Sequence, residues 1–179
     1  IALRYMAQEL DLGYDLFDSI MLSREVQAKN MAERLMEIAQ EEDIKDIVIV
    51  GKAYKPLVPY DGGSASMLVG HYIESSPSYN LHYLDEIIGD KPPVDLGKAV
   101  YLMAHCPEIT YGNQLDFVDD WYDDHTVSEA DTALTVATAN GTALDPVDGS
   151  VIVDPWRRTP AIPNVRVVHY GNTRKNALR

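Results

Sequence analysis

The stretch "DIVIVGKAYKPLVPYDGGSAS", residues 46–66, decides the fold of this chain. Residues 47–50 form a continuous β-branched run, which is typical of a strand that is covered on both faces. The apolar spacing of residues 64–75 predicts a helix, for which Ser64 is a suitable N-cap. A buried strand, a long loop and a helix in succession indicate an α/β fold.

Other segments of the chain repeat these signals. A second helix is predicted at residues 126–140, where Thr126 and Glu129 form a capping box and Gly141 suits the C-terminal cap. The apolar, β-branched pattern predicts further strands at residues 80–84, 98–104, 150–154 and 165–170.

This order of elements predicts an α/β fold with a mainly parallel sheet. The connection 86–97 contains two adjacent prolines and is barely long enough for a crossover. We therefore expect this connection to be irregular.

Residues 1–42 read as a helical region that precedes the domain. Apolar residues recur at steps of three and four from Ile1 to Ile38, and Gly13 is a point where the helix could break. The apolar positions cover more than one face. Two interpretations remain open: an ordinary core helix, or a helix that packs on something beyond its own domain, such as a partner subunit.

Composition narrows the classes of protein to consider. The chain has 179 residues, of which 46% are hydrophobic, as in an ordinary globular domain. Its formal net charge of −13 disfavours nucleic acid and anionic lipid as partners. No apolar run has the ~18 residues of a membrane span, and no signal peptide is visible.

The single cysteine, Cys106, excludes an internal disulfide and fits a reducing compartment, so we expect a cytoplasmic protein. We interpret Cys106 itself as a small buried hydrophobe. The chain opens with Ile1 and not with Met, and we expect that the natural start lies upstream.

The loop 51–63 is the first candidate site, because ligands of parallel α/β sheets lie beyond the carboxyl ends of the strands. It combines Lys52, Tyr54 and Lys55 with two glycines before a predicted helix start, which favours an anion. The alternative is a solvated loop whose lysines extend into water. Its spacing fits neither a G-x-G-x-x-G turn nor a P-loop.

Two further features have alternative interpretations. Residues 116–131 pack many carboxylates around His125, but EF-hand spacing is absent, and we predict a solvated acidic insertion and no metal site. His105 follows a predicted strand and has either a contact with a ligand or a structural hydrogen bond.

Several stretches resemble one family. "IVIVGKAYKP", residues 47–56, resembles the I-x-V-L-G-x-A-[FY]-K-P motif that opens the C-terminal domain of the UDP-glucose/GDP-mannose dehydrogenases. In the same order along the chain, "HYLDE" (82–86), "VIVDPWR" (151–157) and "VRVVHYGN" (165–172) resemble later strands of that domain. The resemblance covers nearly the whole chain and is poor over 86–97 and 110–148.

The family oxidises the C6 hydroxyl of a nucleotide sugar to a carboxylate, using NAD and a cysteine. The resemblance implies that this chain is the second half of such an enzyme. Residues 1–42 would be the central dimerising helix of a homodimer, and residues 43–179 would be a Rossmann-like three-layer α/β domain with a mainly parallel sheet. The NAD-binding domain and the catalytic cysteine would lie upstream. This chain alone would hold no catalytic residue and would be inactive.

What the resemblance leaves to this chain is binding of the nucleotide-sugar substrate. Lys55 matches the family lysine, with Tyr54 beside it, and Arg157 or Arg158 matches a basic residue that contacts the substrate phosphates. One position departs from the family pattern, because Gly62 stands where the family has an arginine. That departure favours the alternative, a non-catalytic α/β binding or assembly module.

Overall fold

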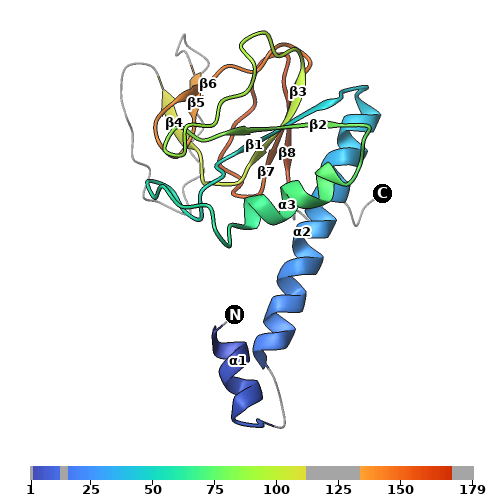
Figure 1. The fold of residues 1–179 in the computed structure, drawn as a ribbon. Helices are drawn as coiled ribbons and strands as arrows, with labels where there is room; N and C mark the ends of the chain where they lie inside the picture. The colour runs from blue at the N-terminus through green and yellow to red at the C-terminus, as the bar shows by residue number, and fades with distance from the viewer. Residues whose placement is uncertain (1, 13–15, 112–133, 171–179) are drawn as a thin grey trace.

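The computed structural model describes residues 2–12, 16–111 and 134–170 (Figure 1). Three helices are present there: α1 (Ala2–Glu9), α2 (Leu16–Glu41) and α3 (Ala65–Glu74). The main strands are β1 (Asp46–Val50), β2 (Asn80–Leu84), β3 (Ala99–Met103), β7 (Val151–Asp154) and β8 (Arg166–His169). Three shorter strands are β4 (Glu108–Tyr111), β5 (Leu134–Ala137) and β6 (Ala143–Leu144).

The five main strands form one sheet in the order β2-β1-β3-β7-β8, and every neighbouring pair is parallel. The predicted α/β class with a parallel sheet is confirmed. All five strands therefore end at the same edge. The strand order changes direction between β1 and β3, and such a switch point is where open α/β sheets bind ligands.

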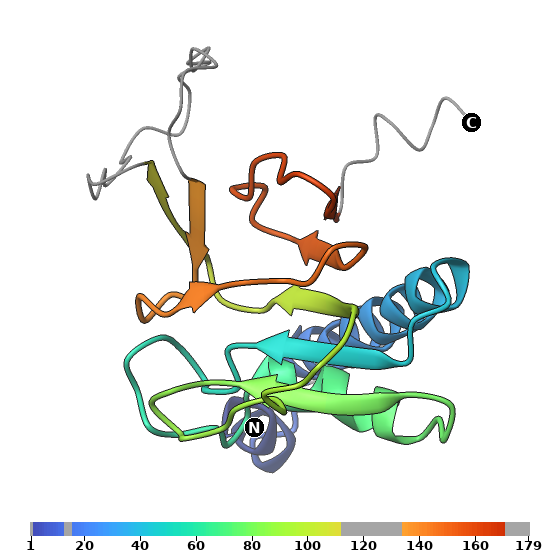
Figure 2. The same cartoon turned by 90° about the horizontal axis from the view of Figure 1, so that it is seen from above.

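Alternate residues of the strands face two separate hydrophobic clusters, which produces three layers. Ile47 and Ile49 pack with α2 and α3 on one face of the sheet. Val48 and Val50 pack on the other face with residues that include Val136 of β5. Figure 2 shows the helices on one side of the sheet and the small β4–β5–β6 sheet away from them.

Helix α2 divides into two parts with different surroundings. Its C-terminal half packs on the sheet through Ala32, Leu35 and Ile38, all fully buried, as an ordinary core helix does. Its N-terminal half projects beyond the sheet and lies beside α1 (Figure 1). The region 1–42 is thus two helices, and Gly13 lies outside the described residues.

The predicted helix at 126–140 is wrong where the structure describes it. Residues 134–137 form β5, which pairs antiparallel with β4 and β6. The β-branched residues Thr135, Val136 and Thr138 favour a strand over a helix. Gly141, with φ of +85°, does not cap a helix but lies in the turn between β5 and β6. Thr126 and Glu129 lie outside the described residues.

The connection between β2 and β3 has no helix or named strand, as its prolines predict, and contains one isolated bridge between Asp85 and Asp90. Within the described ranges, the structure contains no helix that is both long enough and apolar enough to cross a membrane.

Candidate functional site

A buried aspartate organises the loops after β1 and β2. Asp85 directly follows β2 and is 1% exposed. Its Oδ2 accepts hydrogen bonds from the backbone N–H groups of Lys52 (2.9 Å) and Ala53 (2.8 Å). Its Oδ1 accepts from those of Ile87 (3.1 Å) and Ile88 (3.3 Å). One carboxylate thereby ties the start of loop 51–63 to the start of the next connection.

A second buried aspartate, Asp154 at the end of β7, organises the turn that carries both candidate arginines. Its Oδ1 accepts from the backbone N–H groups of Trp156 (2.7 Å) and Arg157 (3.1 Å). Its Oδ2 accepts from those of Arg158 (2.8 Å) and Thr159 (2.6 Å). The turn is fixed by these four bonds, and the side chains of both arginines are exposed.

Gly51, directly after β1, lies against His105, which follows the neighbouring strand β3. Gly51 has φ of +98°, and a Cβ added there would lie 2.6 Å from the ring of His105. Nε2 of that histidine bonds to the carbonyl oxygen of Ala53 at 3.0 Å. Ser66 also donates to the carbonyl oxygen of Gly51 at 2.6 Å. His105 therefore has a structural hydrogen bond that holds the candidate loop.

The two lysines of loop 51–63 have different environments. Nζ of Lys52 lies 2.8 Å from Asp90 and 3.8 Å from Asp61, and 5.1 Å from the ring centre of Tyr83. The hydrogen bond with Asp90 is the main cause that raises the pKa of Lys52 above its ordinary value. Lys52 is thus a structural cation that joins its loop to the connection after β2.

Lys55 is exposed, and Tyr54 beside it is 61% exposed. With respect to the described part of the chain, the Lys55 ammonium and the Arg157 guanidinium have no hydrogen bond or ion pair. Both cations follow strands of the same parallel sheet, β1 and β7, so both lie at its carboxyl edge. The side chain of Arg158 has an interaction of its own.

Cys106 follows β3 at the same edge. Burial raises the pKa of its thiol, and the nearby Arg158 opposes that rise only in part. A raised pKa keeps the thiol protonated at neutral pH, whereas a nucleophilic cysteine needs its thiolate. Cys106 was interpreted as a small buried hydrophobe, and the structure shows it partly buried with a protonated thiol.

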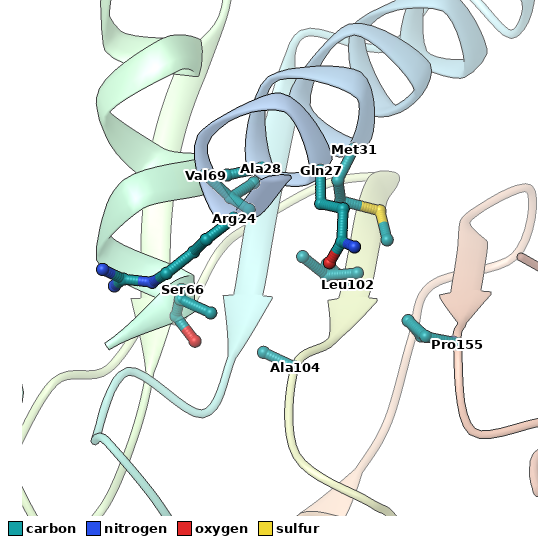
Figure 3. Close-up of a pocket in the computed structure, with 10 residues that line it drawn as sticks. Arg24, Gln27, Ala28, Met31, Ser66, Val69, Leu102, Ala104 and Pro155 are labelled. Carbon is teal, nitrogen blue, oxygen red and sulfur yellow. The ribbon is translucent and has the colours of Figure 1, made fainter. Parts of the chain in front are cut away.

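A cavity of about 200 Å³ lies beneath α2, next to the carboxyl end of β3 (Figure 3). Its walls are mostly apolar and include Leu102 and Pro155. Gln27 extends from α2 toward Leu102, while Arg24 reaches the start of α3 and donates to the carbonyl oxygen of Gly63 at 2.7 Å. None of the four substrate-binding residues predicted from the sequence lines this cavity.

The acidic stretch 116–131 with His125 lies outside the described residues. Among the residues that are described, no three His, Cys, Asp or Glu side chains group as a metal site requires.

Sequence reasoning missed the residues that hold the site together. Asp85 directly follows one predicted strand and Asp154 is the last residue of another, and these strand-end positions are the signal that could have found them. Asn140 accepts a hydrogen bond from Leu57 of the candidate loop. This contact could not be predicted, because Asn140 falls in the helix predicted at 126–140.

Comparison with known proteins adds no assignment, because no protein-family model, curated protein or solved structure matches this chain.

Proposed function

We propose that this chain is the substrate-binding, C-terminal part of an NAD-dependent nucleotide-sugar dehydrogenase, and that it binds the diphosphate of a UDP-sugar at the carboxyl edge of its sheet. The observation that carries the proposal is the state of Lys55. It is exposed, has no ionic partner among residues 2–12, 16–111 and 134–170, and lies on a loop that Asp85 and His105 fix at a strand end. A cation held in this way suits a diphosphate.

Arg157 supports the same proposal from β7. Its backbone is fixed by Asp154 and its guanidinium is exposed, so it can present a planar fork of donors to a second phosphate oxygen. Tyr54 and Trp156, which are sequence neighbours of the two cations, are 61% and 49% exposed and can offer aromatic faces to a ligand. Arg158 is the second candidate cation of that turn.

NAD enters this proposal as a cofactor that is bound mainly outside the chain. The loop after β1 is long and begins with the close approach of His105 to Gly51. It does not form the short glycine turn onto a helix that holds a dinucleotide. We place hydride transfer and the nucleophilic cysteine in an upstream domain, and the enzyme in the cytoplasm.

The binding proposal is tested by calorimetric titration of the 179-residue chain with UDP-glucose, UDP and GDP-mannose. Lys55→Ala and Arg157→Ala should each weaken binding of the preferred nucleotide about tenfold or more, because each removes a charge-assisted contact. Lys45→Ala is the matched control, since Lys45 is also exposed but precedes β1, at the opposite edge of the sheet. Equal losses in all three variants would mean that net charge, and not this site, governs binding.

The second candidate function is a non-catalytic assembly module, and the apolar surface of α1 and α2 favours it. Leu10, directly after α1, is 66% exposed, and Ile20 and Leu22 are 52% and 64% exposed on α2, which projects beyond the sheet. Exposed apolar residues gathered in one region mark an interaction surface. The same surface would serve the homodimer of the first proposal.

Self-association is tested by sedimentation velocity. We expect the chain to sediment as a dimer, and Leu22→Asp to raise its dissociation constant about tenfold or more, because a carboxylate is costly to bury. Val94→Asp is the control, since Val94 is fully exposed on the connection between β2 and β3. If the parent chain sediments as a monomer, this surface is not a dimer contact. Dimerisation without nucleotide binding would favour the assembly module.

A further inference from the structure

The tip of loop 51–63 contacts a hairpin that lies far away in the sequence. The backbone N–H of Leu57 donates a hydrogen bond of 3.2 Å to Oδ1 of Asn140. Leu57 has φ of +62°, a left-handed conformation that is unfavourable for any residue with a Cβ. Such a conformation persists when neighbouring structure supports it. Asn140 supplies support of this kind to Leu57, which lies two residues after Lys55.

Asn140 is held in turn by a well-bonded hairpin. Thr138 is 3% exposed, and its backbone N–H donates to the carbonyl oxygen of Thr142 at 2.8 Å. The Thr138 hydroxyl oxygen accepts from the backbone N–H groups of Asn140 (3.3 Å) and Thr142 (3.2 Å). The turn between β5 and β6 therefore presents Asn140 in one backbone conformation.

The carboxamide of Asn140 is oriented by a second loop. Its Nδ2 donates to Oε2 of Glu86 at 3.4 Å, and Glu86 also accepts from the Thr138 hydroxyl. An ionised carboxylate only accepts hydrogen bonds, so the amide nitrogen must face Glu86. The amide oxygen then faces Leu57. One side chain thereby links the loops after β1 and β2 to the small antiparallel sheet.

We propose that Asn140 is a positioning residue that fixes the loop tip and so places Lys55 for an anionic ligand. For the function proposed above, on which this step rests, that ligand is a diphosphate. Asn140 acts on the ligand only through the loop. The β5–β6 hairpin is then a part of the binding site that approaches it from outside the parallel sheet.

The first test needs no ligand. Hydrogen exchange of the Leu57 amide, followed by nuclear magnetic resonance, should be about tenfold faster in Asn140→Ala than in the parent chain, because its acceptor is gone. Asn140→Asp should also accelerate exchange, because a second carboxylate would face Glu86. Asn80→Ala is the matched control, since exposed Asn80 also donates to a carboxylate, that of Asp46, away from this loop. Unchanged Leu57 exchange in Asn140→Ala would overturn the proposal.

The second test links Asn140 to Lys55 by titration with inorganic pyrophosphate and UDP. Asn140→Ala should weaken binding about three- to tenfold, and Asn80→Ala should leave it unchanged. In the double variant Lys55→Ala/Asn140→Ala, binding should be no weaker than in Lys55→Ala alone, because Asn140 acts through Lys55. Additive losses would contradict the proposal. If the parent chain binds neither ligand, the proposed function fails, and the exchange of Leu57 still decides whether Asn140 fixes the loop.

Discussion

Replacing Asp154 by alanine should lower the free energy of unfolding by about 3–5 kcal/mol. Asp154 is fully buried, and its carboxylate is the acceptor for four backbone N–H groups between Trp156 and Thr159. Alanine would leave these donors without their acceptor, and the amide of Thr159, which is 1% exposed, would have no access to water. Urea denaturation followed by circular dichroism measures the loss.

Two variants make that experiment specific. Asp148→Ala removes an exposed carboxylate that accepts one bond from Asn164, and it should change stability by no more than about 0.5 kcal/mol. Asp154→Asn keeps one oxygen acceptor, so its loss of unfolding free energy should lie between those of Asp154→Ala and Asp148→Ala. A loss for Asp154→Ala as small as that for Asp148→Ala would show that the turn does not depend on its buried carboxylate.

Replacing Gly51 by alanine should lower the free energy of unfolding by about 3 kcal/mol or more, from two separate causes. The left-handed φ of +98° is unfavourable for any residue with a side chain. In addition, the new Cβ would lie 2.6 Å from the ring of His105, which is 9% exposed and bonded to Ala53. The ring would have to move, and the hydrogen bond that holds the candidate loop would be lost.

Gly89 separates these two causes. Its φ of +92° is nearly the same, but a Cβ added there would meet no atom within 4 Å. Gly89→Ala should therefore lower the free energy of unfolding only through the unfavourable backbone conformation, by about 1 kcal/mol. The difference between the two glycine variants in urea denaturation measures the contact with His105. Equal losses would mean that this contact contributes nothing.

Local sequence signals were sufficient to predict the parallel sheet. The continuous β-branched run at 47–50 and the N-cap at Ser64 each act over a few residues, and the structure confirms both elements. The helix predicted at 126–140 was wrong where it can be compared. That prediction relied on residues that suit helix caps, and the antiparallel pairing of β5 with β4 and β6 decided the outcome.

The candidate site was less predictable than the fold. Residue type and spacing placed Lys52 and Lys55 in one loop without separating their roles, and only the family resemblance selected Lys55. The carboxylate that pairs with Lys52 comes from Asp90, on another loop. The contact between Leu57 and Asn140 joins residues that only tertiary structure brings together. Interactions of this kind leave no periodic signal in the sequence.

The two buried aspartates also affect how this edge of the sheet can hold a phosphate. In many α/β proteins, backbone amides at strand ends bind the anion directly. Here Asp85 and Asp154 already occupy amides of the turns after β1, β2 and β7, as anions supplied by the chain itself. Attraction for an external phosphate would then come from exposed side-chain cations such as Lys55 and Arg157. Water and dissolved ions screen exposed charges strongly, so the affinity of this edge for phosphate would fall steeply with ionic strength.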